Sequence, residues 1–152
     1  TTKKVGVKGQ FKKVEITNGG EGNTAKEAIN NSEFSIPVSS IFTKDTSRDF
    51  KIKKFFFGVM DNTSLLSGKL LIENDSIGHA NITMNGVTAK LPFTYTITDK
   101  TFILKATMNL ANWNGKKAVA SLNEACKDLH KGKDGVSKTW DDVAIKITSV
   151  FQ

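Results

Sequence analysis

A strict alternation of apolar and polar residues through the middle of the chain constrains its fold more than any other feature. The alternation spans residues 91–97, stops at Asp99-Lys100, and resumes over residues 102–108. A period of two places every second side chain on the same face of a strand, so each run predicts a strand with one buried face. The break at Asp99-Lys100 predicts a turn, and the two runs together predict a β-hairpin.

Further strands are indicated on both sides of this hairpin. Two dipeptides, Asn74-Asp75 and Asn85-Gly86, are typical of tight turns between antiparallel strands. Asn and Gly both tolerate the positive φ that such turns require. The glycines at 6 and 9 suggest a bend or bulge in the first strand. Besides the central hairpin, strands are expected over residues 5–16, 34–38, 68–72, 81–84 and 143–147.

About seven strands with one apolar face each must bury those faces against one another, in a barrel or a sandwich. Long strands joined by short hairpins favour an antiparallel β-barrel, and a barrel of about eight strands can hold one small ligand. The residues that recur on the apolar face are large and adaptable, and they suit either a ligand cavity or a filled core. The expected inward set is Phe34, Ile36, Val38, Ile82, Met84, Leu91, Phe93, Tyr95, Leu104, Met108, Ile145 and Ile147.

Three segments have helical patterns. Residues 24–31 begin with Thr24 and Glu27 in a capping-box spacing. Residues 46–57 follow an extended segment directly, so this helix is expected to cap the barrel mouth. Residues 116–130 place their apolar side chains on one stripe, with Asn114 as the expected cap and Gly132 as the stop. The stripe of this third helix consists of Val119, Leu122, Cys126 and Leu129.

Length and composition narrow the class of protein. The 152 residues are predicted to form a single domain over 1–152, without an apolar run of the roughly 20 residues that a membrane helix needs. The formal charge of +7 comes from lysines spread over the whole chain, which indicates a solvated surface and no nucleic-acid partner. The lone Cys126 is expected in the core, and with two histidines it forms no spacing typical of a metal site.

Catalytic motifs are also missing from the sequence. There is no Gly-x-Ser-x-Gly elbow, no phosphate-binding loop and no paired-histidine motif. Asp141 and Asp142 are neighbours on a predicted strand, so their side chains point to opposite faces. The chain is therefore predicted to be no enzyme and to need no cofactor.

Four segments, taken in order, resemble one known family. They are residues 5–16, a glycine-rich opening; residues 36–57, a strand followed by an Arg-Asp pair and a helical Phe-Phe; residues 80–93, with a Gly-Val-Thr hairpin; and the closing strand 139–147. Together they resemble the YceI-like, polyisoprenoid-binding proteins, in particular members found in the Bacteroidetes. Only Thr1 to Lys4 precede the glycine-rich segment, which leaves open whether the family's first strand is present.

The resemblance implies a lipocalin-like antiparallel β-barrel with short helices, periplasmic or secreted, that carries a long polyisoprenoid or fatty-acyl chain. Its expected partner is therefore an apolar, lipid-like small molecule, bound without catalysis; a homodimer is left open. An alternative is an envelope structural or interaction module with a filled barrel core and no ligand.

The resemblance and the inward pattern together predict the site residues. Arg48 is the only arginine, and its forked guanidinium suits either a structural corner or an anionic head group. With Lys53 and Lys54 it forms the predicted head-group contacts. The predicted ligand-binding residues are Phe34, Ile36, Val38, Phe55, Phe56, Met84, Phe93, Tyr95, Leu104 and Met108.

Overall fold

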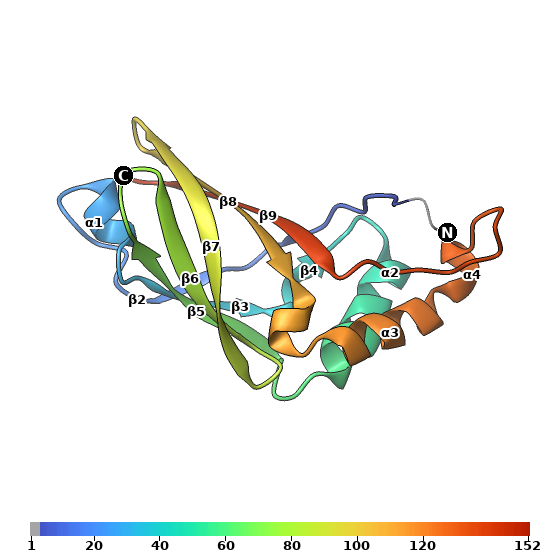
Figure 1. Cartoon of the computed structure of the whole chain (residues 1–152). Coiled ribbons are helices and arrows are strands. Elements are labelled where there is room, and N and C mark those ends of the chain that lie inside the picture. The colour runs from blue at the N-terminus through green and yellow to red at the C-terminus, as the bar shows by residue number, and fades with distance from the viewer. Residues whose placement is uncertain (1–3) are drawn as a thin grey trace.

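The computed structural model describes residues 4–152 and is dominated by one antiparallel sheet. Seven strands follow one another in the order β2-β3-β5-β6-β7-β8-β9, and the sheet curls into a half-barrel with β2 and β9 at its edges (Figure 1). This confirms the predicted lipocalin-like antiparallel class. The strands are β2 (Glu15–Asn18), β3 (Glu33–Pro37), β5 (Leu65–Ile72), β6 (Ile77–Met84), β7 (Val87–Thr98), β8 (Thr101–Asn109) and β9 (Asp142–Val150).

The remaining elements gather mostly at one end of the sheet. A two-stranded pair, β1 (Gln10–Phe11) with β4 (Ile41–Phe42), leads to the helical segments that lie together there (Figure 1). Helix α1 lies near the opposite end of the sheet. The helices are α1 (Ala25–Ile29), α2 (Thr46–Lys51), α3 (Lys116–Ala125) and α4 (Lys127–His130), a π-helix η2 (Ile52–Phe56), and 3-10 turns η1 (Val38–Ser40), η3 (Phe57–Val59) and η4 (Leu110–Trp113).

The predicted hairpins are present, and their turns use the residues that the sequence indicated. Asn85 and Gly86 have φ values of 56° and 68°, as the turn between β6 and β7 requires. Asp99 has a φ of 54° in the turn between β7 and β8. Asn74 follows β5, and its side chain accepts hydrogen bonds from the backbone of Ser76 and Ile77. Turn chemistry therefore sets the strand order in this part of the sheet.

The predicted inward face is confirmed. Every member of the inward set is buried or packs against the core cluster, while Thr94, Thr96, Lys105 and Lys146 on the other face are exposed. A shift of one residue would have exchanged the two sets, so the alternation identified the register of the strands correctly.

The opening segment differs from the prediction. Residues 5–16 were expected to form one bent strand, but only Gln10–Phe11 and Glu15–Asn18 pair with neighbouring strands. The Cβ of a side chain at Gly9 would lie 2.8 Å from Cγ2 of Thr43, so the chain passes close to that residue, beside Phe42 of β4. Val5 and Val7 are exposed. The apolar residues of this segment therefore do not form a continuous buried stripe.

The two longer helices also depart from their predicted form. After α2 the chain widens into the π-helix, which adds a residue to the turn and rotates the following side chains. As a result Phe57, rather than Phe55, is buried. The third helix breaks at Cys126, whose backbone leaves the helical region, and this turns Leu129 out to 75% exposure. Cys126 itself is buried, as predicted.

The expected cap of the third helix is wrong. Asn114 adopts a left-handed conformation with a φ of 54° and ends η4, and Gly115 takes the cap position of α3. Asparagine tolerates this conformation better than most residues, which explains why it can close one turn and leave the next helix to glycine. No helix within residues 4–152 is both long enough and apolar enough to span a bilayer.

Candidate ligand-binding site

The concave side of the sheet carries one contiguous apolar cluster. All of the predicted ligand-binding residues except Phe55 belong to it or pack directly against it. Phe93 and Tyr95 lie edge to face at a ring distance of 6.2 Å, and Tyr95 also contacts Phe102 at 5.5 Å. The sheet therefore brings the predicted residues of β3, β6, β7 and β8 together, as the alternation required.

Two phenylalanines of this cluster lie over glycines of the neighbouring strand. Phe34 pairs with Gly68 and Phe93 pairs with Gly78. A Cβ at Gly78 would meet the Phe93 ring at 2.6 Å and the carbonyl oxygen of Leu71 at 2.4 Å, so only glycine fits there. The absence of a side chain at these glycines thus leaves room for the two rings against the neighbouring strand. Glycines within predicted strands were the available signal, but the sequence did not show which rings cover them.

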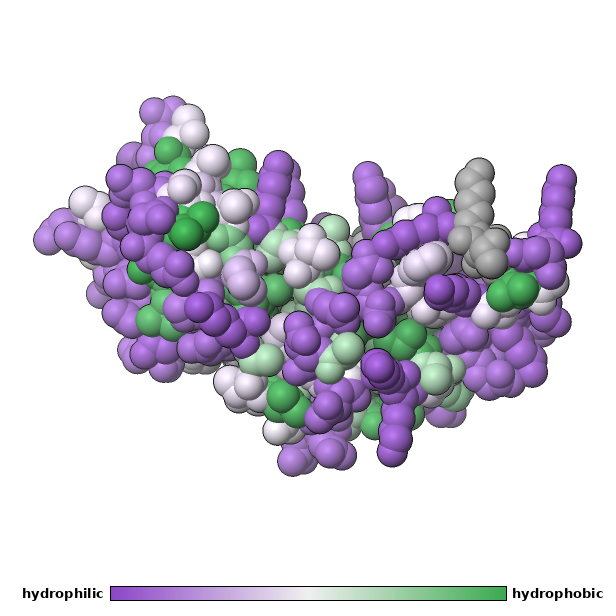
Figure 2. Space-filling view, in the orientation of Figure 1, coloured by the Kyte–Doolittle hydropathy of each residue, from purple (hydrophilic) through white to green (hydrophobic). Residues whose placement is uncertain are grey.

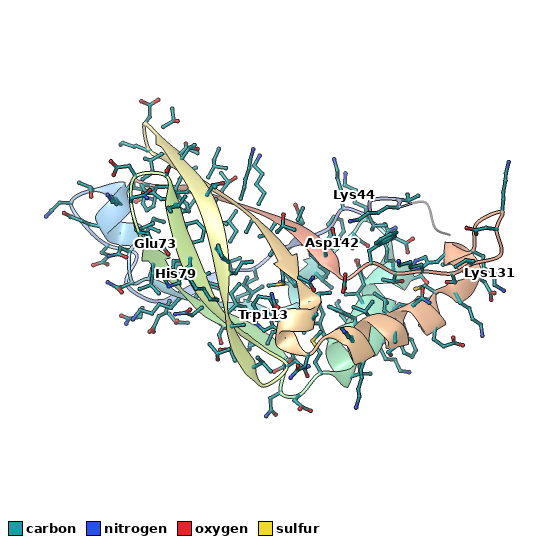
Figure 3. All side chains as sticks on the ribbon, viewed as in Figure 1. Lys44, Glu73, His79, Trp113, Lys131 and Asp142 are labelled. Carbon is teal, nitrogen blue, oxygen red and sulfur yellow. The ribbon has the colours of Figure 1, made fainter. Side chains whose placement is uncertain are left out.

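The helix end of the half-barrel is closed by Trp113, which the sequence analysis did not single out. It is fully buried on η4, and its Nε1–H donates to the carbonyl oxygen of Ile82 at 2.8 Å. The side-chain amide of Asn85 donates to the backbone oxygen of Trp113 at 2.9 Å. Figure 3 shows Trp113 beside the sheet, where β8 ends. The Trp113 indole thus links η4 to β6, and the Asn85 side chain links the β6–β7 turn to η4.

Arg48 and Asp49 bind the same residue, Thr43, and no ion pair joins them within residues 4–152. Arg48 donates from Nε to Thr43 Oγ1 at 2.9 Å and from Nη2 to the Thr43 carbonyl at 2.8 Å. The buried Asp49 carboxylate accepts from the Thr43 backbone N–H at 2.8 Å and from its hydroxyl at 2.6 Å. The arrangement holds α2 against the residue that follows β4, so the arginine fork serves a structural corner.

Of the other predicted residues at the helix end, Lys53, Lys54 and Phe55 lie apart from the apolar cluster, whereas Phe56 packs against it. Lys53 and Lys54 are exposed on the π-helix. The Lys54 ammonium lies 5.5 Å from the centre of the Phe50 ring and 5.4 Å from that of Phe55. Phe55 is therefore half-buried beneath a lysine and does not line the interior, whereas Phe56 contacts Phe57 at a ring distance of 4.8 Å and packs on the core. The π turn separates these neighbours.

A groove of about 740 Å³ crosses the sheet where β7 and β8 separate. Its lining combines inward residues of the strands, such as Phe93, Ala106 and Ile145, with outward ones. In the centre of the face shown in Figure 2, white and green atoms lie between hydrophilic side chains. The full lining is Glu73, Ile77, Gly78, Lys90, Pro92, Phe93, Thr94, Lys105, Ala106, Thr107, Ala144, Ile145 and Lys146.

Glu73 is the one acidic residue in that lining. The His79 ring lies with Nδ1 2.7 Å from Glu73 Oε1 (Figure 3). The Lys90 ammonium lies 3.7 Å from the same oxygen. The hydrogen bond with His79, reinforced by the charge of Lys90, lowers the pKa of Glu73 below its ordinary value. Glu73 is therefore an anion at neutral pH and partly neutralises Lys90.

No group of three or more His, Cys, Asp or Glu side chains is placed to share a metal ion among the described residues. The geometry instead defines a curled antiparallel sheet with an apolar inner face, a helical end and an open groove in its wall.

This arrangement is that of a lipocalin-like half-barrel. The chain belongs to the family defined by the YceI-like domain, whose family model matches residues 1–151. Curated protein sequences yield no match to the chain. The predicted family is thereby confirmed, while the likeness to Bacteroidetes members stays a prediction.

Solved structures share the fold at low sequence identity. A YceI protein of Campylobacter jejuni is 16% identical, with a TM-score of 0.64 over 99% of this chain and 88% of its own. A polyisoprenoid-binding domain from Saccharophagus degradans, implicated in plant cell wall breakdown, is 8% identical, with a TM-score of 0.58 over 80% and 76%. BcnA of Burkholderia cenocepacia is 16% identical, with a TM-score of 0.57 over 95% and 87%. At these identities the likeness concerns the fold.

Proposed function

We propose that the protein binds a long apolar molecule, of the polyisoprenoid or fatty-acyl type, against the inner face of its half-barrel and performs no chemistry on it. The observation that carries this proposal is the continuity between the apolar cluster and the groove, because Phe93, Ala106 and Ile145 belong to both. Membership of the YceI-like family, and the polyisoprenoid-binding neighbour, support the same class of ligand.

The chemistry of the inner face fits a chain-like guest better than a polar one. The side chains of Phe93, Tyr95, Met84 and Met108 offer flat rings and flexible thioethers, which adapt to an irregular aliphatic chain. Each methylene buried contributes about 0.8 kcal/mol, so a chain of several isoprene units could bind tightly with few polar contacts. Such a site would select its ligand by length and width more than by specific hydrogen bonds.

A second candidate is the envelope structural or interaction module with a filled core. The observation in its favour is the complete burial of the largest inner side chains, with Trp113, Phe102 and Leu104 at no more than 2% exposure. A core packed in this way needs no guest for stability. The two candidates differ in whether the inner face can open to admit a chain.

Extraction of the purified protein separates the candidates directly. Organic extracts analysed by mass spectrometry should contain a co-purifying prenyl or acyl chain if the protein is a carrier. A clean extract, together with no uptake of a fluorescent fatty-acyl or prenyl probe, would favour the filled module.

Substitutions at the inner face locate the bound chain. Met108→Glu or Phe93→Glu should abolish probe binding, because either would place a charge in the apolar cluster. Since a buried charge can also unfold the protein, Ala106→Trp provides a second variant that fills the groove without adding charge. Its matched control is Thr96→Trp, which adds the same bulk on the exposed face outside the groove. A folded Ala106→Trp variant that binds the probe like the parent would place the ligand elsewhere.

The periplasmic or secreted location expected from the family resemblance is part of the same proposal, since a lipid carrier of this kind would act between membranes. Fractionation of the source cells, followed by immunoblotting, tests it. Recovery only in the cytoplasmic fraction would contradict it.

A further inference from the structure

The wall of the half-barrel is split between two adjacent strands. β7 and β8 pair only from Thr94–Lys105 to the turn at Thr98–Thr101. Before that point, residues 87–93 pair with β6, and beyond it residues 106–109 pair with β9. Figure 1 shows the two strands separating away from their shared hairpin. The groove described above lies at this split, where the ladder of hydrogen bonds is interrupted.

Three lysines surround the split on its outer side. Lys105 and Lys146 are directly opposite each other on β8 and β9, with Thr94 in the same row on β7. Lys90 lines the groove from β7. Like charges placed opposite each other on neighbouring strands destabilise a sheet. Neither Lys105 nor Lys146 forms an ion pair with an acidic residue of the described chain, so no ion pair offsets these like charges.

The charge of the groove is matched to an anion. Its three lysines and one glutamate give a formal net charge of +2, on a surface that turns apolar toward Phe93, Ala106 and Ile145. A cationic rim above an apolar floor suits a molecule with a charged head and an apolar chain, because each part then meets a surface of its own kind. Lysine is a compact charge that binds phosphate oxygens well.

We infer that the split between β7 and β8 is a lateral entrance for a single-chain amphiphile with a phosphate head. Lys90, Lys105 and Lys146 hold the head at the outer face, and the chain passes beside Phe93 and Ala106 to the inner face. This inference rests on the proposed apolar ligand and adds the chemistry of its head and its route. The head-group site inferred here differs from the one predicted from the sequence at the helix end. Arg48 of that predicted site uses its fork to bind Thr43.

The test compares two probes that share a chain and differ in their head. Tetradecyl phosphate and tetradecanol, each below the concentration at which it aggregates, compete with a bound fluorescent fatty-acyl probe. The groove variant is Lys105→Gln with Lys146→Gln. The control is Lys116→Gln with Lys117→Gln, which removes the same charge at the exposed start of α3.

The groove variant is expected to bind tetradecyl phosphate at least tenfold more weakly than the parent does. Its affinity for tetradecanol should stay within twofold of that of the parent. The control should leave both unchanged. If the groove variant binds tetradecyl phosphate like the parent while tetradecanol still binds, the entrance is wrong and the proposed apolar ligand stands. If the parent binds neither probe, both proposals fail.

Two further arms distinguish other sources of phosphate. Inorganic phosphate that competes with tetradecyl phosphate at similar concentrations would overturn the inference, since the site would then bind a free anion. Binding restricted to vesicles of phosphatidylglycerol, with none to monomeric tetradecyl phosphate, would also overturn it and indicate a membrane-docking surface. A loss of tetradecyl phosphate binding in Lys53→Gln with Lys54→Gln, but not in the groove variant, would place the head at the helix end.

Discussion

The helix end of the sheet and the middle of β8 differ in how their polar groups are paired. Where β8 runs into η4 at the helix end, Trp113 and Asn85 each donate to a backbone carbonyl, and the nearby Thr43 is bound by both Arg48 and Asp49. In the middle of β8, where the split begins, Lys105 is paired with Lys146 of β9, and neither residue has an acidic partner among the described residues. Satisfied polar groups stabilise a fold, whereas like charges directly opposite each other on neighbouring strands cost stability.

This contrast separates residues that hold the fold from residues available to a ligand. Arg48 was predicted as a head-group contact because guanidinium suits phosphate, yet its donors are used at a structural corner. Lys105 and Lys146 of the groove, by contrast, have no acidic partner among the described residues. The chemical type of a charged side chain is therefore a weaker guide to ligand binding than its surroundings. A charged residue without an oppositely charged partner is the better candidate.

Trp113→Ala should produce the largest loss of stability in the molecule. The side chain is fully buried and its Nε1–H is paired, so its removal leaves a cavity and breaks the hydrogen bond to the Ile82 carbonyl. Truncation of a buried tryptophan costs about 3–5 kcal/mol. Urea unfolding measures this loss, and Trp140→Ala at a partly exposed position serves as the control. A loss below about 1 kcal/mol would mean that the paired groups at the helix end do not contribute the stability assigned to them here.

Asp49→Ala should have the next largest effect. It removes a buried carboxylate that accepts two hydrogen bonds and leaves the Thr43 N–H without its partner. Hydrogen bonds to charged groups contribute about 1.5–3 kcal/mol, and we expect a loss in that range. Arg48→Lys should lower the stability less, because lysine keeps the positive charge. Some loss remains, since lysine cannot reproduce the fork. Equal losses for both variants in urea unfolding would contradict the division of roles at Thr43.

Asp45 makes part of the helix end sensitive to acid. Its carboxylate caps α2 by accepting from the Arg48 backbone N–H at 3.0 Å, and this hydrogen bond lowers its pKa below the ordinary value. A carboxyl whose pKa is lower in the folded state stabilises the protein above its unfolded pKa of about 3.9, and the contribution is lost as the pH falls through the folded value. Asp45→Asn keeps a cap that does not titrate.

The parent should therefore have a melting temperature a few degrees above that of Asp45→Asn at pH 7, and the difference should vanish near pH 2. Calorimetry at both pH values measures it. A difference that persists at pH 2 would show that the charge of Asp45 is not its source.

The sequence predicted the central sheet well because its information there is local. Residues 91–108 specify two alternating runs and a turn, and these decide both the register and the inward face. The π turn that exchanges Phe55 for Phe57 has no local pattern, so the sequence could not reveal it. The split and the Lys105–Lys146 pair depend on how β8 pairs with β9, which the helical segment separates in the chain. The candidate entrance is thus a non-local feature, visible only in the folded sheet.

Lys105→Glu should produce the smallest effect and the one of opposite sign. It replaces a like-charge pair across β8 and β9 with an opposite-charge pair, so the protein should become more stable by about 0.2–1 kcal/mol. The gain should shrink in 1 M NaCl, because salt screens exposed charges. Lys100→Glu, in the turn before β8, is the matched control and should change stability less. Urea unfolding at low and high salt measures both variants. If Lys105→Glu is more stable and also loses binding of tetradecyl phosphate, the like-charge pair lowers stability in favour of binding. If Lys105→Glu is no more stable than the parent, the two lysines do not repel each other and the contrast between the helix end and the split fails.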